Sequence, residues 1–352
     1  MAITQKQIAH SLGVSHQLVS YALNGGGTVS ERKRREILEA AHQMGYRRNE
    51  LARAMVTGKS HLLGLLTYSN SGEHIATMVA GALFEAAKAG YAVKVLHVPF
   101  EGSASEIREV AHRCAAWQLD GAVAVSLLPG ALEVLSQQLS ERGCPIACVE
   151  NMTGRDDILV KTDDGSAFRA AVKHLKALGH RRIVHLSGPN HPISRSRNAI
   201  FLRMLAELGL PVSQDSLIPT HPHDWQDRAG IEAATHALLD RSPRPTAVIC
   251  AGDAAAMIAM RVAQQRGFRV PGDLSVIGFG NFELGAHAYP PLTSIAQPFR
   301  EMGLLATQRL IELISSGETA LSNATSLAAP VRGTDELPAH LVVRESTAPP
   351  AL

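Results

Sequence analysis

Four side chains that can form hydrogen bonds lie close together near the amino terminus. The run 16–23 has apolar residues at helical spacing, and its outward positions are His16, Gln17, Ser20 and Tyr21. A Gln side chain pairs with adenine, and His or Tyr can reach base edges or phosphates in a major groove. An exposed helix with these residues at its amino-terminal end is typical of a helix that reads DNA. The alternative is a helical hairpin that only contacts a neighbouring domain.

Two further helices are expected to hold this run in place. Thr4 begins a capping-box pattern, and the helix that follows should end at Gly13. Ser15 can cap the second helix and Ser30 a third. Three amphipathic helices in about 45 residues can share a small core, and the first two form a helix-turn-helix. The apolar residues that the second and third helices are expected to contribute to this small core are Leu18, Val19, Ala22, Ile37, Leu38, Ala41 and Met44.

The charge of the chain is unevenly distributed. The 352 residues contain 34 Lys and Arg against 32 Asp and Glu, which alone would argue against a polyanionic partner. Residues 1–60, however, contain nine basic and four acidic residues, so the other 292 contain 25 and 28. A small basic segment on a slightly acidic body indicates that one end meets a nucleic acid. A solvated charged helix is the alternative for the basic run 32–35.

The amino-terminal segment resembles the DNA-binding head of the LacI/GalR (lactose-repressor) family. The matching runs are 8–15 (IAHSLGVS), 19–24 (VSYALN), 29–30, 37–41 (ILEAA), 45–46 and 49–53 (NELAR). The resemblance implies that His16, Gln17 and Tyr21 read bases of double-stranded operator DNA. The family usually has Arg at the position of Tyr21, and Tyr lacks the paired N–H donors with which Arg forms two parallel hydrogen bonds. Further DNA contacts implied by the resemblance are Thr4, Ser15, Ser20, Asn24, Val29, Arg53 and Met55.

Residues 49–58 (NELARAMVTG) resemble the hinge helix of that family. Asn49 can cap it, but about nine residues are too few for a helix that is stable alone in water. The resemblance implies that this helix folds on DNA and inserts Met55 as a wedge into the minor groove. Without the resemblance, Met55 would be read as ordinary helix packing.

From residue 61 onward, β-rich runs alternate with amphipathic helical patterns. This alternation predicts an α/β class of fold with mostly parallel, doubly wound sheets, and its length favours two sheets rather than one. A break between them is expected near 151–162. The predicted strands are 62–67, 92–98, 121–126, 145–149, 183–187, 247–250 and 274–278. The predicted helices are about 74–89, 104–117, 130–142, 165–178, 194–209, 227–240 and 253–267.

This body also resembles the family's effector-binding core, a pair of lobes like those of periplasmic binding proteins. The matching phrases are 179–183 (GHRRI), 187–189 (SGP), 245–247 (PTA), 270–278 (VPGDLSVIG), 290–295 (PPLTSI) and 341–346 (LVVRES). The expected domains are a helix-turn-helix head at 1–48, a hinge at 49–60 and a core at 61–352. Lobe one is expected at about 61–160 and 293–323, and lobe two at about 161–292 and 324–352. Residues 347–352 read as a disordered tail.

A ligand of such a core is expected where the carboxyl ends of the strands face each other. The resemblance implies that Arg197 grips ligand oxygens, with Arg195 as a substitute, and that Trp225 stacks on a ligand ring. Gly252 and Gly280 stand where the family commonly has polar side chains, so two polar contacts to a sugar are missing. The other effector positions implied by the resemblance are His74, Ile75, Asp253, Gly280, Asn281 and Gln297.

These departures lead to a hypothesis about the ligand. Arg197 and nearby histidines (His74, His191 and His223) would make the cleft cationic, which suits an anionic or bulkier ligand. A regulator of this fold that has lost its effector is the alternative.

The chief rival class is an enzyme on a Rossmann-like fold. The run 278–285 (GFGNFELG) has its third Gly at the wrong spacing, and no P-loop, G-x-S-x-G or H-E-x-x-H motif occurs. His221 and His223 could hold a metal, although paired histidines on a loop more often have polar surface roles. We therefore expect no catalysis, no metal and no cofactor.

The four cysteines have no C-x-x-C spacing, and neither a signal peptide nor 18 consecutive apolar residues occur. These features predict a cytoplasmic protein, and the resemblance implies a transcriptional repressor that binds a pseudo-palindromic operator and a small-molecule effector. We expect a homodimer, with a tetramer as the alternative, and no membrane contact.

Overall fold

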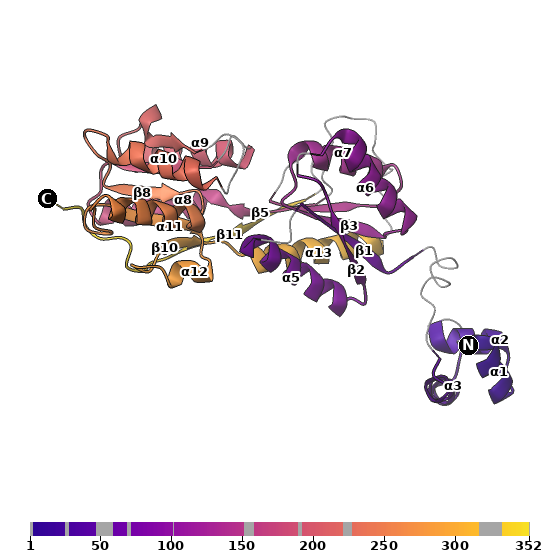
Figure 1. The fold of residues 1–352 in the computed structure, drawn as a ribbon. Coiled ribbons are helices and arrows are strands. Elements are labelled where there is room, and N and C mark those ends of the chain that lie inside the picture. Colours follow the sequence, from indigo (N-terminus) through magenta and orange to yellow (C-terminus); the bar gives the residue numbers. More distant parts are fainter. Residues whose placement is uncertain are drawn as a thin grey trace. The chain divides into compact units, whose positions relative to one another are not determined.

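The computed structural model describes residues 3–24, 28–46, 59–68, 72–100, 102–150, 158–188, 192–220, 227–316 and 333–351. It divides the chain into two compact units, Met1–Ser60 and His61–Leu352. We call them the head and the core, and Figure 1 labels most of their helices and strands. Within the described residues, no helix is long and apolar enough to cross a membrane.

The described part of the head contains three helices: α1 (Gln5–Leu12), α2 (His16–Asn24) and α3 (Glu31–Gln43). Thr4 caps α1 through the predicted capping box, in which its hydroxyl accepts from the Gln7 amide. Gly13 ends α1 in the left-handed conformation, with φ of 62°. Ser30 caps α3 by accepting from the Lys33 amide.

The core of the head agrees with the predicted apolar spacing except at one residue. Ile8, Val19 and Ile37 are completely buried, and small alanines from each helix pack beside them. Leu38, which we expected inside, is 45 % exposed. It lies one position beyond Ile37, and one step rotates a side chain by about 100° around a helix.

The first sheet of the core has the strand order β11-β5-β4-β3-β1-β2, and every pair in it is parallel. Helices α6 and α7 contribute to the apolar cluster on one face, and α5 and α13 to the cluster on the other. The strands are β1 (Leu62–Thr67), β2 (Ala92–His97), β3 (Gly121–Val125), β4 (Ile146–Val149), β5 (Ile158–Asp163) and β11 (Thr334–Pro338). The helices are α5 (Glu73–Lys88), α6 (Ala104–Ala116), α7 (Pro129–Ser140) and α13 (Phe299–Ser316).

The second sheet has the order β12-β10-β9-β8-β6-β7, and only β12 among its described strands is antiparallel to its neighbour. Helices α8 and α9 pack on one face, and α10 and α11 on the other. The strands are β6 (Ile183–Ser187), β7 (Leu217–Pro219), β8 (Ala247–Cys250), β9 (Ser275–Gly280), β10 (Thr293–Ala296) and β12 (His340–Val342). The helices are α8 (Asp164–Ala177), α9 (Pro192–Glu207), α10 (Arg228–Leu239), α11 (Asp253–Gln265) and the short α12 (Glu283–Ala286), with a 3-10 turn at Gln214–Ser216.

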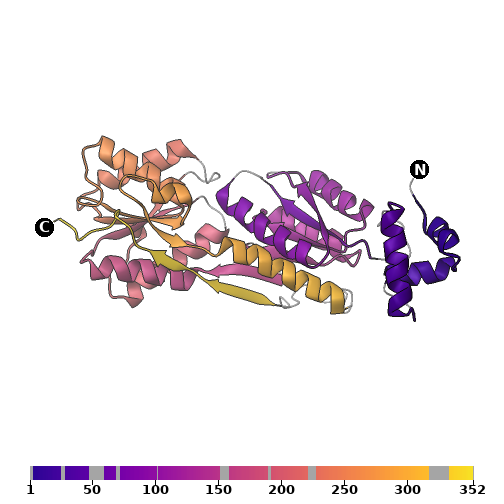
Figure 2. The same cartoon turned by 90° about the horizontal axis from the view of Figure 1, so that it is seen from below.

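The described segments cross between the lobes three times, and two expected lobe boundaries are wrong. It crosses from β5 into α8, from β10 into α13 and from β11 into β12. Residues 293–296 pair with β9 in the second sheet, although we expected them in lobe one. Residues 334–338 pair with β5 in the first sheet, although we expected them in lobe two. Figure 2 shows the yellow strands of the last segment passing from one lobe to the other. Backbone pairing decides where a crossing strand belongs, and side-chain patterns do not reveal it.

The segment after β12 is hydrogen-bonded to the second lobe, so the prediction of a disordered tail from residue 347 is wrong. The Ser275 hydroxyl donates to the Ala348 carbonyl over 3.0 Å, and the Ala348 amide donates back over 3.1 Å. His180 Nε2 also lies 2.9 Å from the Ala348 carbonyl oxygen. These bonds fix backbone groups that would otherwise be free to move.

Candidate functional site

The outward face of α2 presents the side chains that the sequence singled out. His16, Gln17 and Tyr21 are exposed, whereas Ser20 is only half-buried. The opposite face of the helix carries Val19 into the core of the head. Burial of that face fixes which residues α2 presents outward.

One hydrogen bond joins two of these exposed side chains. The Gln17 side-chain Nε2 donates to the Tyr21 hydroxyl oxygen over 2.7 Å. The two residues are four positions apart, which places them one above the other on a helix. The sequence reasoning treated Gln17 and Tyr21 as separate readers, whereas the structure makes them a pair.

Other head residues of the predicted site have structural roles in the described part of the chain. Thr4 caps α1, and the Ser15 hydroxyl accepts from the Leu18 amide over 3.1 Å at the start of α2. Val29 packs against the core of the head. The Asn24 side chain, Arg53 and Met55 lie outside the described residues.

In the core, Arg197 lies between two carboxylates. It belongs to α9 and is 6 % exposed. Its Nε donates to Asp164 Oδ2 over 3.0 Å, and its Nη2 lies 3.6 Å from Glu150 Oε2. The guanidinium also covers the Phe279 ring, with its carbon 4.2 Å from the ring centroid. Arg197 therefore does not face the cleft as a lone cation, while His191 and His223 of the same hypothesis lie outside the described residues.

Glu150 links β4 to the strand that crosses between the lobes. Its Oε1 accepts from the Thr162 hydroxyl over 2.6 Å and from the Thr162 amide over 3.1 Å. Gln297, at the β10–α13 crossing, donates from its Nε2 to the same hydroxyl over 2.8 Å. Burial raises the pKa of the Glu150 carboxyl, and the nearby Arg197 opposes this only in part. Of these three residues, the sequence had indicated only Gln297.

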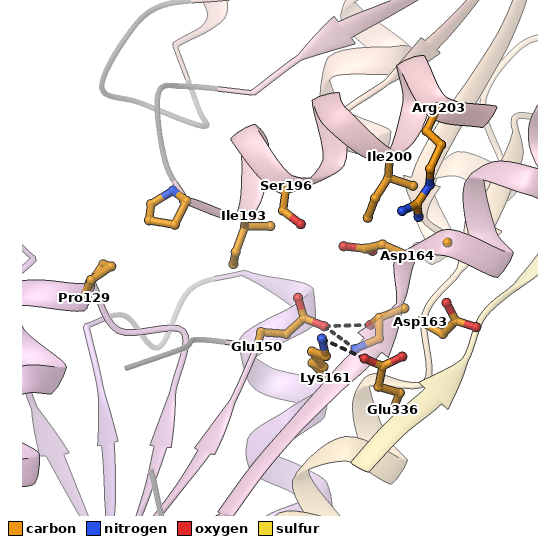
Figure 3. A pocket seen from close by; sticks show the side chains of 13 residues that line it. Pro129, Glu150, Lys161, Asp163, Asp164, Ile193, Ser196, Ile200, Arg203 and Glu336 are labelled. Carbon is orange, nitrogen blue, oxygen red and sulfur yellow. Dashed lines mark hydrogen bonds and ion pairs between the residues drawn. The ribbon is translucent and has the colours of Figure 1, made fainter. Parts of the chain in front are cut away.

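A hollow of about 240 Å³ lies beside this group, between the lobes (Figure 3). We call it the acidic hollow because four carboxylates and only two cations line it. One cation, Lys161, is paired with Glu336 over 2.7 Å. Its lining residues are Pro129, Glu150, Lys161, Thr162, Asp163, Asp164, Gly165, Pro192, Ile193, Ser196, Ile200, Arg203 and Glu336.

Three polar atoms on α8 and α9 are buried without a hydrogen-bond partner. They are Asp164 Oδ1, Ser194 Oγ and Asn198 Oδ1. The Asp164 carboxylate and the Asn198 amide oxygen can only accept hydrogen bonds. Because buried polar groups are nearly always paired, these atoms indicate that donors from water or a ligand belong here.

An aromatic group joins the lobes on the side of α5 and α12. The Phe282 ring, which follows β9 in the second lobe, stacks on Phe299 with centroids 5.9 Å apart. The His74 ring lies 5.9 Å from Phe299 and 6.3 Å from Phe282. Burial, and secondarily Arg197, lowers the pKa of His74, which favours the neutral imidazole. The Glu283 amide also donates to Glu73 Oε1 over 3.1 Å. We call His74, Phe282 and Phe299 the interlobe aromatic group.

Several predicted effector residues are occupied by structural contacts. Asp253 is fully buried and accepts from the Ser294 hydroxyl and from the Phe282 amide. Asn281 Oδ1 accepts from the Arg344 guanidinium over 2.7 Å. Ile75 is buried in the core of the first lobe.

At Gly280 the Phe282 ring takes the space of a side chain. A Cβ there would lie 2.8 Å from the ring, and φ at this residue is 130°. Trp225 and the histidine pair at 221 and 223 lie outside the described residues. Within the described chain, no three His, Cys, Asp or Glu side chains are grouped as a metal site would need.

Two family models match the chain. Residues 4–49 match "Bacterial regulatory proteins, lacI family", and residues 172–347 match "Periplasmic binding protein-like domain". The lactose operon repressor of Escherichia coli (strain K12) is 29% identical over 351 residues, with 99% of this chain and 91% of the relative covered. The transcriptional regulator CelR of Thermobifida fusca is 29% identical over 354 residues, with 97% and 98% covered.

Solved structures agree in fold over nearly the whole length. A Lac repressor dimer bound to operator and the anti-inducer ONPF superposes with a TM-score of 0.80 at 25% identity, covering 99% of this chain and 100% of that one. A complex of the regulator CelR with cellobiose gives a TM-score of 0.70 at 26% identity, covering 98% and 99%.

Proposed function

The chain belongs to the lacI family of bacterial regulatory proteins, and from this premise we propose that it represses transcription as a ligand-controlled dimer on a pseudo-palindromic operator. It is a DNA-binding transcriptional regulator, not an enzyme. Its site of action would be the bacterial cytoplasm, where the chromosome lies. The observation that carries the proposal is the exposed row of His16, Gln17 and Tyr21 on α2 of a basic head.

Selection of bound fragments from genomic DNA tests this function directly. The expected product is a two-fold symmetric site, because paired heads read two half-sites about one or two helical turns apart. Binding should weaken steeply as salt rises, since the head replaces counterions on phosphates. Recovery of fragments without a shared symmetric sequence would contradict the proposal.

Met55 keeps its proposed role as a wedge at the centre of the operator, and Arg53 its proposed role as a DNA contact. An apolar side chain that unstacks a base step weakens specific binding when shortened, while non-specific phosphate contacts remain. Met55→Ala should therefore lower affinity for the selected site far more than for random duplex. Equal loss on both would remove the wedge role.

Apolar side chains on one side of the core support the proposed dimer. Leu83 and Phe84 on α5 are exposed, and so are Leu284 on α12 and the nearby Tyr289. Figure 1 shows α5 and α12 on the same side of the two lobes. Large exposed apolar side chains on helices that lie on the same side of a protein are candidates for a contact surface. We assign this face to the dimer.

We assign a neutral polyhydroxylated ligand to the space between the lobes. Arg197 is paired with Asp164 and lies 3.6 Å from Glu150, and acidic side chains outnumber basic ones around the acidic hollow. Unpaired acceptors on Asp164 and Asn198 suit hydroxyl donors. A phosphate or carboxylate ligand would meet like charges instead. The solved CelR complex contains cellobiose, a neutral disaccharide, which agrees with this class.

Calorimetry with two probes separates the ligand classes. Cellobiose should bind at least tenfold tighter than glucose 6-phosphate, and Arg197→Ala should abolish the stronger binding. The reverse order would restore an anionic ligand. If the ligand changes the affinity of the protein for DNA by some factor, DNA must change the affinity for the ligand by the same factor.

A ligand-independent regulator is the second candidate, because the interlobe aromatic group already joins the lobes. In that case neither probe, nor a wider panel of sugars and purines, would change the affinity for the selected operator. Such a result would favour constitutive repression.

A further inference from the structure

We propose that Tyr21 is a positioning residue that orients the Gln17 amide for base reading. The inference rests on the proposed function, in which α2 lies in the major groove. It differs from the expectation that Tyr21 reads a base itself.

Both residues of the proposed pair lie on the same helix. Gln17 and Tyr21 are both exposed on α2, and Gln17 Nε2 donates to the Tyr21 hydroxyl over 2.7 Å. Val19 and Ala22 are buried on the opposite face, so the helix cannot turn its outward row away. The pair is therefore in place before any duplex arrives.

The chemistry of the held amide selects a base. A Gln amide has two N–H donors and one carbonyl acceptor. With one N–H donated to Tyr21, one donor and the acceptor remain for the groove. Adenine offers there an N7 acceptor and an N6 amino donor, which complement that remaining set. Guanine offers two acceptors, N7 and O6, and would leave the Gln17 carbonyl unpaired.

Holding the amide also lowers the cost of binding. A free Gln side chain gives up rotamer entropy when it is fixed. In this head part of that loss has occurred already in the free protein. Without the Tyr21 hydroxyl the amide rotates, and bases other than adenine become more acceptable.

A double-mutant cycle on base preference tests the inference. The variants are Tyr21→Phe, Gln17→Ala and both together, each in the full chain. The readout is the relative affinity for the four bases at the half-site position where Gln17→Ala changes preference, measured on a library of half-site duplexes. Tyr21→Phe should lower the preference for adenine about three- to tenfold. In the Gln17→Ala background it should have no further effect, because the side chain that it orients is gone.

The head offers a matched control. The Gln5 side chain donates to the Tyr46 hydroxyl over 3.1 Å, which is the same kind of bond away from α2. Tyr46→Phe should leave base preference unchanged, so a general loosening of the head is distinguished from loss of positioning.

Three outcomes would overturn the inference. Equal losses from Tyr21→Phe with and without Gln17 would make Tyr21 an independent reader. An unchanged preference in Tyr21→Phe, or in Gln17→Ala, would remove the positioning role while leaving the proposed function intact. A wild-type protein that prefers no duplex would overturn the proposed function as well.

Discussion

A buried guanidinium with two carboxylates beside it behaves as a single unit. Arg197 contacts Asp164 and Glu150, and none of the three side chains is well exposed. Removing one member leaves an uncompensated charge away from water, which costs more than the pair itself contributes. The ion-pair group is therefore a structural link between the end of β4 and α9, and two of its members, Glu150 and Asp164, line the acidic hollow.

The pH dependence of stability tests the burial of Glu150. Because burial raises its pKa, the folded protein holds this proton more tightly than the unfolded chain does. Its stabilising contribution is present below the ordinary pKa of 4.5 and falls as pH rises above it. In the wild type the free energy of unfolding should fall by up to about 1.4 kcal/mol for each pH unit across this window, and Glu150→Gln should remove that fall.

Urea unfolding between pH 5 and pH 8 measures this difference in slope. Glu336→Gln, at an exposed ion pair with Lys161, is the control and should run parallel to the wild type. Parallel curves for Glu150→Gln would show that the Glu150 carboxyl does not titrate abnormally.

The cysteines give a second prediction at the residue scale. All four are buried and none forms a disulfide, and burial raises the pKa of Cys114 to about 11 and of Cys144 to about 12. A thiolate is the reactive form, so the folded protein should react with Ellman's reagent at least tenfold more slowly than a small free thiol. In denaturant all four should react at once. Rapid reaction of one thiol under native conditions would reveal an accessible redox site.

At the scale of elements, the turn after β9 depends on one buried carboxylate. Asp253 begins α11 and accepts hydrogen bonds from the Ser294 hydroxyl on β10 and from the Phe282 amide. It thereby ties together α11, β10 and the segment that carries Phe282 into the interlobe aromatic group. Burial raises the pKa of Asp253, while these two hydrogen bonds oppose the shift.

Asp253→Ala should destabilise the core by about 2–4 kcal/mol, because it leaves buried donors unpaired. Asp240→Ala, which removes an exposed partner of Arg266, should cost less than about 1 kcal/mol. Guanidinium unfolding of both variants gives the comparison. Similar losses would mean that Asp253 is not a central link.

Local signals predicted most of the elements, because caps and apolar spacing act within a few residues. Thr4, Gly13 and Ser30 placed the head helices, and the β-α alternation placed the main strands. The strand β5 was hidden, since its first residues fell within the expected break at 151–162. Which sheet β10 and β11 join depends on partners far along the chain.

The candidate site was predicted less completely for the same reason. A family resemblance pointed to Arg197, but nothing in the sequence around Glu150 indicates that its partner is Arg197. Glu150 becomes part of the site only because β4 and α9 meet in three dimensions. Asp253 follows β8 and Asn281 follows β9, as the strand pattern predicted. Their side chains are already hydrogen-bonded, Asp253 to Ser294 and Asn281 to Arg344.

At the scale of the whole molecule, the proposed dimer face gives a mutational test. Leu284 is 67 % exposed on α12. A charge buried in an apolar interface without a partner is strongly unfavourable. Leu284→Glu should therefore weaken the dimer at least tenfold and should also lower operator affinity, because two half-sites need two heads.

Sedimentation at micromolar concentration measures the assembly. Val212→Glu is the matched control, since Val212 is also an exposed apolar residue but lies outside α5 and α12. It should leave the dimer intact. Equal dissociation by both variants would place the interface elsewhere.

The three crossings between the lobes have a mechanical consequence. A single connection lets two bodies rotate about its axis, whereas several connections held together resist that rotation and leave bending as the easier motion. The β5–α8 and β11–β12 connections lie side by side, because Asp163 pairs with Pro338, and the β10–α13 connection is the third. A ligand that binds Arg197 of one lobe and Glu150 of the other would therefore change the angle between the lobes by bending at these connections. The response of this core should be measured as an angle of tilt, not as a twist.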